Sequence, residues 1–311
     1  MSVTAYITHP SCQRHEMGEG HPECPERLAA IQDYLLARGY LDLMPPYTAP
    51  PATDEQILRA HTAHHLANIR DQAPRDGYLR VDPDTSMNPH SFDAALHAAG
   101  AAVLATDIVL KGEVARAFCA VRPPGHHAER DAAMGFCFFN NAAIAVRHAQ
   151  RVHGLKRVAL IDFDVHHGNG SEDILANDDG VLMVSTFQHP LYPYLGDVPR
   201  GDNIINVPLP PRTAGDVMKG AVTSRWLPAL EAFQPELIVI SAGFDAHRED
   251  DIANLGWVDA DYAWVTARLV EVADKYAQGR IVSTLEGGYA LNALARSVGA
   301  HVGVLIGVLD A

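Results

Sequence analysis

Two carboxylates and two imidazoles lie within six residues of one another, directly after an apolar run of the chain. The segment DFDVHHGNG begins at Asp162, and the run RVALI before it is typical of a buried strand. Asp and His are poor strand formers, and burying them without partners is costly, so we expect something to pair them. If the backbone stays extended beyond the strand, Asp164 and His166 point the same way, because side chains alternate along an extended chain.

A further acid, Asp245 in the segment SAGFDAH, ends another apolar run. Two carboxylates and one imidazole, with a fourth position left open, suit a catalytic zinc ion, or iron or manganese. A lone D-x-H motif is more often a capping residue followed by a surface histidine. The acid that ends a neighbouring strand favours the metal site over that interpretation.

Histidines and a phenol supply candidate proton donors and acceptors. His126 and His127 are adjacent in RPPGHH, and a histidine can take a proton from water and return it to a leaving amine. Tyr289, after two glycines in LEGGY, could donate a hydrogen bond to a carbonyl oxygen that gains charge. Asp162 could orient a histidine, and Asn169 could do so more weakly. Taken singly, the histidines also fit an exposed loop, and Tyr289 fits a packed aromatic.

The elements that must position these residues alternate along the chain, which predicts an α/β fold with a mostly parallel sheet in a single domain, 1–311. Apolar runs predict buried strands over 116–121, 157–163, 181–187, 236–243 and 280–286. Helical segments are predicted over 25–38, 91–111, 140–152, 214–233, 259–277 and 290–308. The Pro-rich segment 44–55 is predicted as a loop that leads into a helix.

The polar clusters share one property, which is that each follows the carboxyl end of a predicted strand. RPPGHH follows the first run, DVHHGNG the second, GFDAH the fourth and EGGY the last. Ligands of parallel α/β sheets bind outside the carboxyl ends of the strands. We therefore expect the four clusters to converge on one crevice.

Composition narrows the possible partners and compartments. The net charge is −14, so no basic surface is expected for nucleic acid. The four cysteines form no CxxC pair, which argues against a zinc ribbon or a disulfide framework. No signal peptide is indicated, and no run of about 18 apolar residues predicts a membrane helix. The sequence therefore predicts a cytoplasmic protein that binds no membrane, and it does not predict the oligomeric state.

Four segments together resemble the zinc-dependent histone deacetylase family, to which the bacterial acetylpolyamine amidohydrolases are related. They are RPPGHHAERDAAMGFCFFNNAAIA, LIDFDVHHGNG, ISAGFDAH and LEGGYA, in family order across 122–289. The segment GHPECPERL, at 20–28, is similar to the family's first active-site loop. Asn169, where class I members have Asp, resembles the class II branch and its bacterial type. The fold that the resemblance implies is the single-domain arginase–deacetylase fold, a mostly parallel central sheet flanked by helices.

The resemblance also implies a role for each matching residue. The zinc ligands, with Fe²⁺ as the alternative metal, would be Asp164, His166 and Asp245. The acid–base pair and its supports would be His126 with Asp162 and His127 with Asn169, and Tyr289 would polarise the amide carbonyl. Substrate would contact Gly135, Phe136, Tyr192, Gly288 and the rim acid Asp84. A structural K⁺ or Na⁺ would lie at Asp162, Asp164, His166, Ser185 and Thr186, and Arg27 would line an acetate-exit region.

The implied activity is metal-dependent hydrolysis of an acyl-lysine amide in a protein or peptide. Acetylpolyamines and other small acyl-amides are the alternative substrates, and the acids Glu249, Asp250 and Asp251 are not assigned as a gatekeeper for them. An arginase-like ureohydrolase with two manganese ions would need a second acid, where GFDAH has a histidine. A binding protein without catalytic activity is the remaining alternative, and the complete set of candidate residues argues against it.

Overall fold

Eight strands form one parallel sheet in the order β2-β1-β5-β10-β9-β6-β7-β8. The structure is a computed structural model that describes residues 3–309. The strands are β1 (Thr4–Thr8), β2 (Pro46–Thr48), β5 (Arg116–Cys119), β6 (Val158–Asp162), β7 (Val181–Gln188), β8 (Ile204–Leu209), β9 (Leu237–Ala242) and β10 (Ile281–Leu285). A separate antiparallel hairpin is made of β3 (Leu79–Asp82) and β4 (Thr85–Met87).

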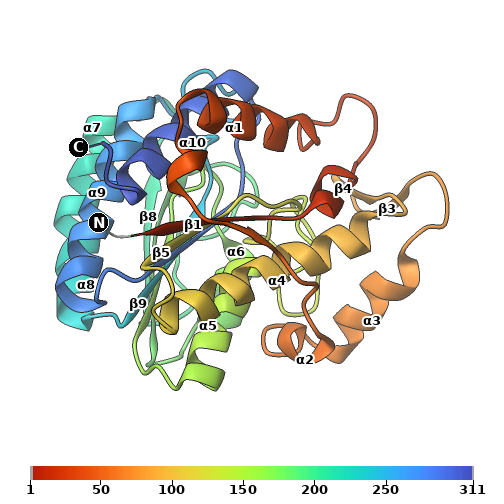
Figure 1. Ribbon diagram of the computed structural model, residues 1–311, viewed down its shortest axis with the longest axis horizontal. Coiled ribbons are helices and arrows are strands. Elements are labelled where there is room, and N and C mark those ends of the chain that lie inside the picture. Colours follow the sequence, from red (N-terminus) through yellow and green to blue (C-terminus); the bar gives the residue numbers. More distant parts are fainter. Residues whose placement is uncertain (1–2, 310–311) are drawn as a thin grey trace.

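Helices cover both faces of the sheet, with α1 and α10 above strand β1 and α4 and α5 below it in Figure 1. The helices are α1 (Glu26–Ala37), α2 (Asp54–Ile57), α3 (Ala63–Gln72), α4 (Ser91–Leu110), α5 (Asn141–His153), α6 (Asn169–Leu175), α7 (Gly215–Ala221), α8 (Leu227–Phe233), α9 (Asp259–Tyr276) and α10 (Leu291–Leu305). Every residue of β6, β9 and β10 is buried. A strand covered on both faces needs apolar side chains on both, which explains the unbroken apolar runs in the sequence.

The fold class and the five central strands predicted from the sequence are confirmed, with strand ends shifted by one or two residues. The sequence analysis did not identify β1, β8 or the β3–β4 hairpin. The prediction of a loop over 44–55 is wrong in part, because Pro46–Thr48 forms β2 at the edge of the sheet. Proline is tolerated there because an edge strand has one row of backbone groups that needs no ladder partner.

The helix predicted over 214–233 is divided. A π-helical turn, Val222–Trp226, separates α7 from α8. Pro228 lies in the first turn of α8, and its missing N–H removes a hydrogen bond that a continuous α-helix would make. A wider local turn before the proline accommodates that loss.

Helix α4 is the one helix among residues 3–309 that is long and apolar enough to cross a membrane. In the structure 72% of its apolar window is buried, and the helix packs against α5 and β5. Its hydrophobicity is therefore that of a core helix.

Candidate active site

The three predicted metal ligands meet beyond the carboxyl ends of β6 and β9, which are neighbours in the sheet. Asp162 at the end of β6 is in register with Ser241 of β9, so the segments that follow the two strands lie side by side. Nδ1 of His166 is 3.0 Å from Oδ1 of Asp164 and 3.2 Å from Oδ2 of Asp245. One ligand atom from each of the three residues lies within 4.8 Å of the other two, and all three side chains are buried.

These residues fit a divalent metal ion. Oδ2 of Asp245 is buried without a hydrogen-bond partner among the described residues. Burial and the neighbouring charge of Asp164 raise the pKa of Asp245 to about 6, because the second buried carboxylate is hard to ionise. A divalent cation would keep both carboxylates ionised, and a mixed oxygen and nitrogen set suits zinc or iron.

The tandem histidines lie against this cluster in two different environments. Nδ1 of His126 lies 3.0 Å from Oδ2 of Asp162, and Nδ1 of His127 lies 2.7 Å from Oδ1 of Asn169. Nε2 of His126 is 3.7 Å from Oδ2 of Asp164. The predicted pairing of each histidine with its support is therefore what the structure contains.

The electrostatics separate the two imidazoles. Burial alone would lower the pKa of His126, but the carboxylates Asp164 and Asp162 outweigh it and raise that pKa well above 6.5. Burial, together with the positive charges of His126 and His166, holds the pKa of His127 well below 6.5. The pKa values of the two imidazoles are therefore shifted in opposite directions, a difference suited to acid–base chemistry.

Two residues that the sequence analysis did not assign bend the RPPGHH loop into place. The buried carboxylate of Glu286, just after β10, accepts hydrogen bonds from the backbone N–H groups of Gly125 and His126 at 2.6 and 3.1 Å. Nδ2 of Asn140, the N-cap of α5, donates to the carbonyls of His126 and Ala128. Glu286 belongs to the LEGGY segment itself, and its place in that segment is the sequence feature that could have identified it.

Tyr289 is held by contacts to the backbone around it. Nε and Nη2 of Arg27 donate to the carbonyls of Gly288 and Glu286 at 2.6 and 2.5 Å, and the guanidinium lies 4.9 Å from the centre of the Tyr289 ring. Oδ2 of Asp250 accepts from the N–H groups of Tyr289 and Ala290. Burial raises the pKa of Tyr289 well above 10, so its hydroxyl keeps the proton that it would donate.

The sequence analysis also did not identify a buried ionic network around Arg27. Oε1 of Glu23 accepts from Nη1 of Arg27 at 3.0 Å, and Oε2 accepts from Nη2 of Arg122 at 2.6 Å. Nε2 of His15 lies 3.4 Å from Oε2 of Glu23. The four-residue spacing of Glu23 and Arg27 is that of a helical ion pair, which was the available signal.

The predicted substrate walls lie on two sides of the histidines. A Cβ on Gly135 would come within 2.4 Å of the His127 ring, so the backbone there can approach the imidazole only without a side chain. The Phe136 ring meets the Tyr289 ring edge-on at 5.8 Å. The Tyr192 ring meets that of His127 edge-on at 5.2 Å, from another loop.

Asp84 lies in the β3–β4 hairpin, and its charge acts on Tyr192. The same hairpin also contacts Phe136, because Oγ1 of Thr85 accepts a hydrogen bond from the N–H of Phe136 at 2.9 Å. Burial, followed by the charges of Asp84 and Asp82, raises the pKa of Tyr192. Asp84 is half-buried, so a role at the rim stays a prediction.

The residues predicted to hold a monovalent cation lie on β6 and β7 and just beyond β6. Asp162 and Ser185 are register partners in the two strands. Oγ of Ser185 donates to Asn206 at 3.1 Å, and Oγ1 of Thr186 is buried without a partner among the described residues. The cation itself remains a prediction.

A ureohydrolase would need another acid near Asp245, and the structure does not place one there from GFDAH. His247 turns to Asp259, with Nε2 3.2 Å from Oδ1. Asp250, one of the three acids that the sequence analysis did not assign as a gatekeeper, accepts from the backbone N–H groups of the Tyr289 loop.

A parallel sheet with an Asp-His-Asp cluster, paired histidines and a phenol at the carboxyl ends of its strands has the arrangement expected of a hydrolase of the arginase–deacetylase fold. The family model described as "Histone deacetylase domain" matches residues 21–305. The chain therefore belongs to the histone deacetylase family.

Two relatives and one solved structure agree with this assignment. A "Probable deacetylase" of Archaeoglobus fulgidus is 37% identical over 300 residues, covering 93% of this chain and 82% of the relative. A "Histone deacetylase-like amidohydrolase" of Pseudomonas aeruginosa is 40% identical over 279 residues, covering 87% and 73%. The crystal structure of the HDA15 HD domain superposes with a TM-score of 0.93 at 33% identity, covering 100% of this chain and 91% of that one.

Proposed function

We propose that this protein is a zinc-dependent amidohydrolase that removes acetyl groups from lysine side chains of proteins or peptides. The observation that carries the proposal is the position of two histidines beside the Asp-His-Asp cluster, one paired with a carboxylate and the other with an amide. Amide hydrolysis needs one group that takes a proton from water and a proton for the leaving amine. A zinc ion is the metal that this donor set favours, with Fe²⁺ as the alternative.

The proposed proton transfers and hydrogen bonds are made by different residues of the chain. Neutral His127 takes the proton of the attacking water at Nε2, because its Nδ1 faces Asn169. Protonated His126 keeps a positive charge beside the reacting centre, held by Asp162. The Tyr289 hydroxyl donates to the carbonyl oxygen as it gains charge, and His127 then returns its proton to the amine. Bound by Asp164, His166 and Asp245, the metal supplies Lewis acidity and lowers the pKa of water.

The remaining parts of the proposal rest on the family and on the sequence. A structural K⁺ or Na⁺ would lie between β6 and β7, with Ser185 and Thr186 among its ligands. A cytoplasmic location is supported by four cysteines that are all free thiols. The net charge of −14 argues against a nucleic-acid partner.

Acetylated polyamines are the second candidate substrate. A cavity of about 340 Å³ borders Tyr289 and is lined on one side by Glu249, Asp250 and Asp251. Acids beside the phenol would attract a polycation. Asp250 is engaged with backbone N–H groups, however, and Glu249 pairs with Arg296 at 2.8 Å, which leaves Asp251 for that purpose and favours the lysine substrate.

The deciding experiment compares kcat/KM of the zinc-loaded enzyme on an acetyl-lysine peptide, N-acetylputrescine and acetylspermidine. Asp245→Ala is the control for the metal site, and metal analysis should find one tightly bound zinc per chain. Faster turnover of the peptide supports the proposal. Faster turnover of the polyamines assigns the enzyme to small-molecule metabolism, and two tightly bound manganese ions would contradict the zinc assignment.

A further inference from the structure

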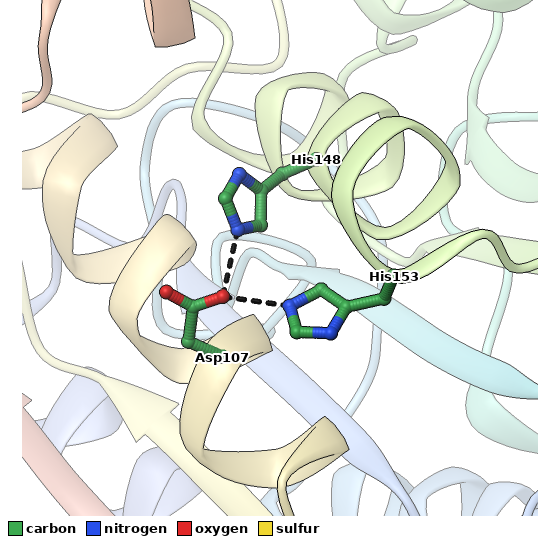
Figure 2. A group of neighbouring side chains, drawn as sticks. All are labelled: Asp107, His148 and His153. Atoms are coloured by element: carbon green, nitrogen blue, oxygen red, sulfur yellow. Dashed lines mark hydrogen bonds and ion pairs between the residues drawn. The ribbon is translucent and has the colours of Figure 1, made fainter.

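A second group of metal-binding side chains lies away from the proposed active site, between helices α4 and α5. Figure 2 shows that Asp107 of α4 faces two histidines of α5, His148 and His153. Nε2 of His148 and Nε2 of His153 lie 2.8 and 2.7 Å from the same carboxylate oxygen, Oδ1 of Asp107. One ligand atom from each residue lies within 4.8 Å of the other two.

The cluster is enclosed but reachable. The side chain of His148 is 4% exposed, whereas those of His153 and Asp107 are 18% and 28% exposed. The two imidazoles are five positions apart on α5, and their ring centres are 5.5 Å apart. An ion can therefore reach the cluster from solvent on the side of the two more exposed residues.

We propose that Asp107, His148 and His153 form a second, exchangeable site for a divalent transition metal such as Zn²⁺, Ni²⁺ or Cu²⁺. Two imidazole nitrogens and one carboxylate oxygen are ligands that these ions accept, and copper should bind tightest of the three. Ligand atoms about 2.0–2.1 Å from a tetrahedral ion lie roughly 3.3 Å apart, so the side chains must separate by about half an ångström. The part-exposed carboxylate has room for that shift.

Arg59, in the turn just after α2, competes with the ion. Its guanidinium has only donors, and Nη1 donates to Nδ1 of His148. The proton of the neutral imidazole then stands on Nε2, where it points at Asp107. To bind a metal through Nε2, His148 must move that proton to Nδ1, and the Arg59 donor must turn away.

The surroundings leave room for the Arg59 side chain to turn away from His148. A cavity of about 660 Å³ lies beside it, lined also by Glu55, Arg147 and Arg151. Nη2 of Arg59 already donates to Glu55 at 2.9 Å, on the exposed side of the helix. The positive charges of Arg59 and of Lys111, which acts on Asp107, make this site weaker than the buried Asp-His-Asp cluster.

The test is a calorimetric titration of Zn²⁺ into enzyme whose tightly bound metal is already in place. Wild type should take up one further equivalent, and Zn²⁺ should raise its Tm because the ion binds the folded state. His153→Gln removes one ligand and should weaken the further equivalent at least tenfold, roughly the smallest effect of losing an outer-shell partner. Arg59→Gln should tighten it by roughly tenfold, because a glutamine carbonyl accepts from Nδ1–H and fixes the metal-binding tautomer.

His64→Gln is the matched control, because His64 also pairs with a carboxylate, Asp131, but is 78% exposed on the surface. Binding and the Tm shift should be unchanged in this variant. Absence of a further equivalent up to about 1 mM Zn²⁺, or equal binding by His153→Gln and wild type, would overturn the proposal. Weaker Zn²⁺ binding by Arg59→Gln than by wild type would refute the proposed competition between Arg59 and the ion. All of these readouts are independent of deacetylase turnover.

Discussion

The two adjacent histidines show how neighbouring residues acquire different chemistry. Burial lowers the pKa of both rings, but His126 faces carboxylates that outweigh it and His127 faces an amide that does not. An amide oxygen accepts the Nδ1 proton of His127 without adding a charge that would hold a second proton. Asn169 is therefore a suitable partner for His127 in its proposed role as the base.

Replacing Asn169 with Asp should change the pH dependence of the reaction. The new carboxylate would raise the pKa of His127 by about one unit or more. Because the base must be neutral, the acidic limb of kcat/KM should move to higher pH by that amount. A pH–rate profile measures the shift, and Asn68→Asp on the exposed face of α3 is the control. An unmoved limb would argue that His127 is not the base.

Tyr289→Phe removes the hydroxyl that is proposed to donate to the carbonyl oxygen. Loss of one such donor lowers kcat roughly 100- to 1000-fold. The fold should persist, because the ring keeps its contacts with Phe136 and Arg27. Steady-state kinetics and circular dichroism test both statements, with Tyr276→Phe on α9 as the control. A kcat within about threefold of wild type would remove Tyr289 from the mechanism.

At the scale of elements, the loop after β10 connects the separate parts of the site. Glu286 holds the histidine loop, Gly287 donates its N–H to Oδ2 of Asp164 at 2.8 Å, and Gly288 is held by Arg27. Three successive residues thus contact the histidine loop at His126, the candidate metal ligand Asp164 and the Arg27 side chain beside Tyr289. The buried ionic network of Glu23 holds Arg27 from behind.

Gly287→Ala should disrupt this loop through the metal ligands. A Cβ at this position would lie 2.1 Å from Oδ2 of Asp245 and 2.6 Å from Oδ2 of Asp164. We expect loss of bound metal and a fall in kcat of at least about 100-fold, since misplaced catalytic groups lose rates of that order. Metal analysis measures the bound metal, and steady-state kinetics measure kcat. Gly220→Ala, on a helix with open space around it, should leave both unchanged.

At the scale of the whole molecule, a buried histidine that is not part of the proposed catalytic set should make stability depend on pH. His301 of α10 is fully buried between hydroxyls, with Nδ1 2.7 Å from Thr266 and Nε2 2.9 Å from Ser283. Burial lowers its pKa from 6.5 to about 3. The native state therefore stays neutral there while the unfolded chain takes up a proton below pH 6.5.

The sign follows from that difference in bound protons. Stability should fall as the pH drops below 6.5 and should continue to fall to about 3. Between pH 7 and pH 5 this one residue should cost about 2 kcal/mol of unfolding free energy. Denaturant unfolding of wild type and His301→Gln at the two pH values measures the difference, with His64→Gln as the surface control. An equal loss in wild type and His301→Gln would contradict the prediction.

The sequence by itself determined the fold class, the central strands and the residues around the candidate metal centre. Strands buried on both faces must be continuously apolar, and polar side chains just beyond them must serve a ligand or find partners. Asp164, His166 and Asp245 were identifiable for this reason. The edge strands β2 and β8 lacked a continuous apolar run, since each has residues facing solvent.

Only the tertiary structure decided which residues act on one another across the chain. The opposite pKa shifts of His126 and His127 depend on carboxylates and an amide brought from other loops. Glu286 reaches the histidine loop across 160 positions of sequence, and Asp107 meets its two histidines across 41 and 46. Such contacts leave no periodicity or spacing in the sequence, because packing of separate elements brings them together.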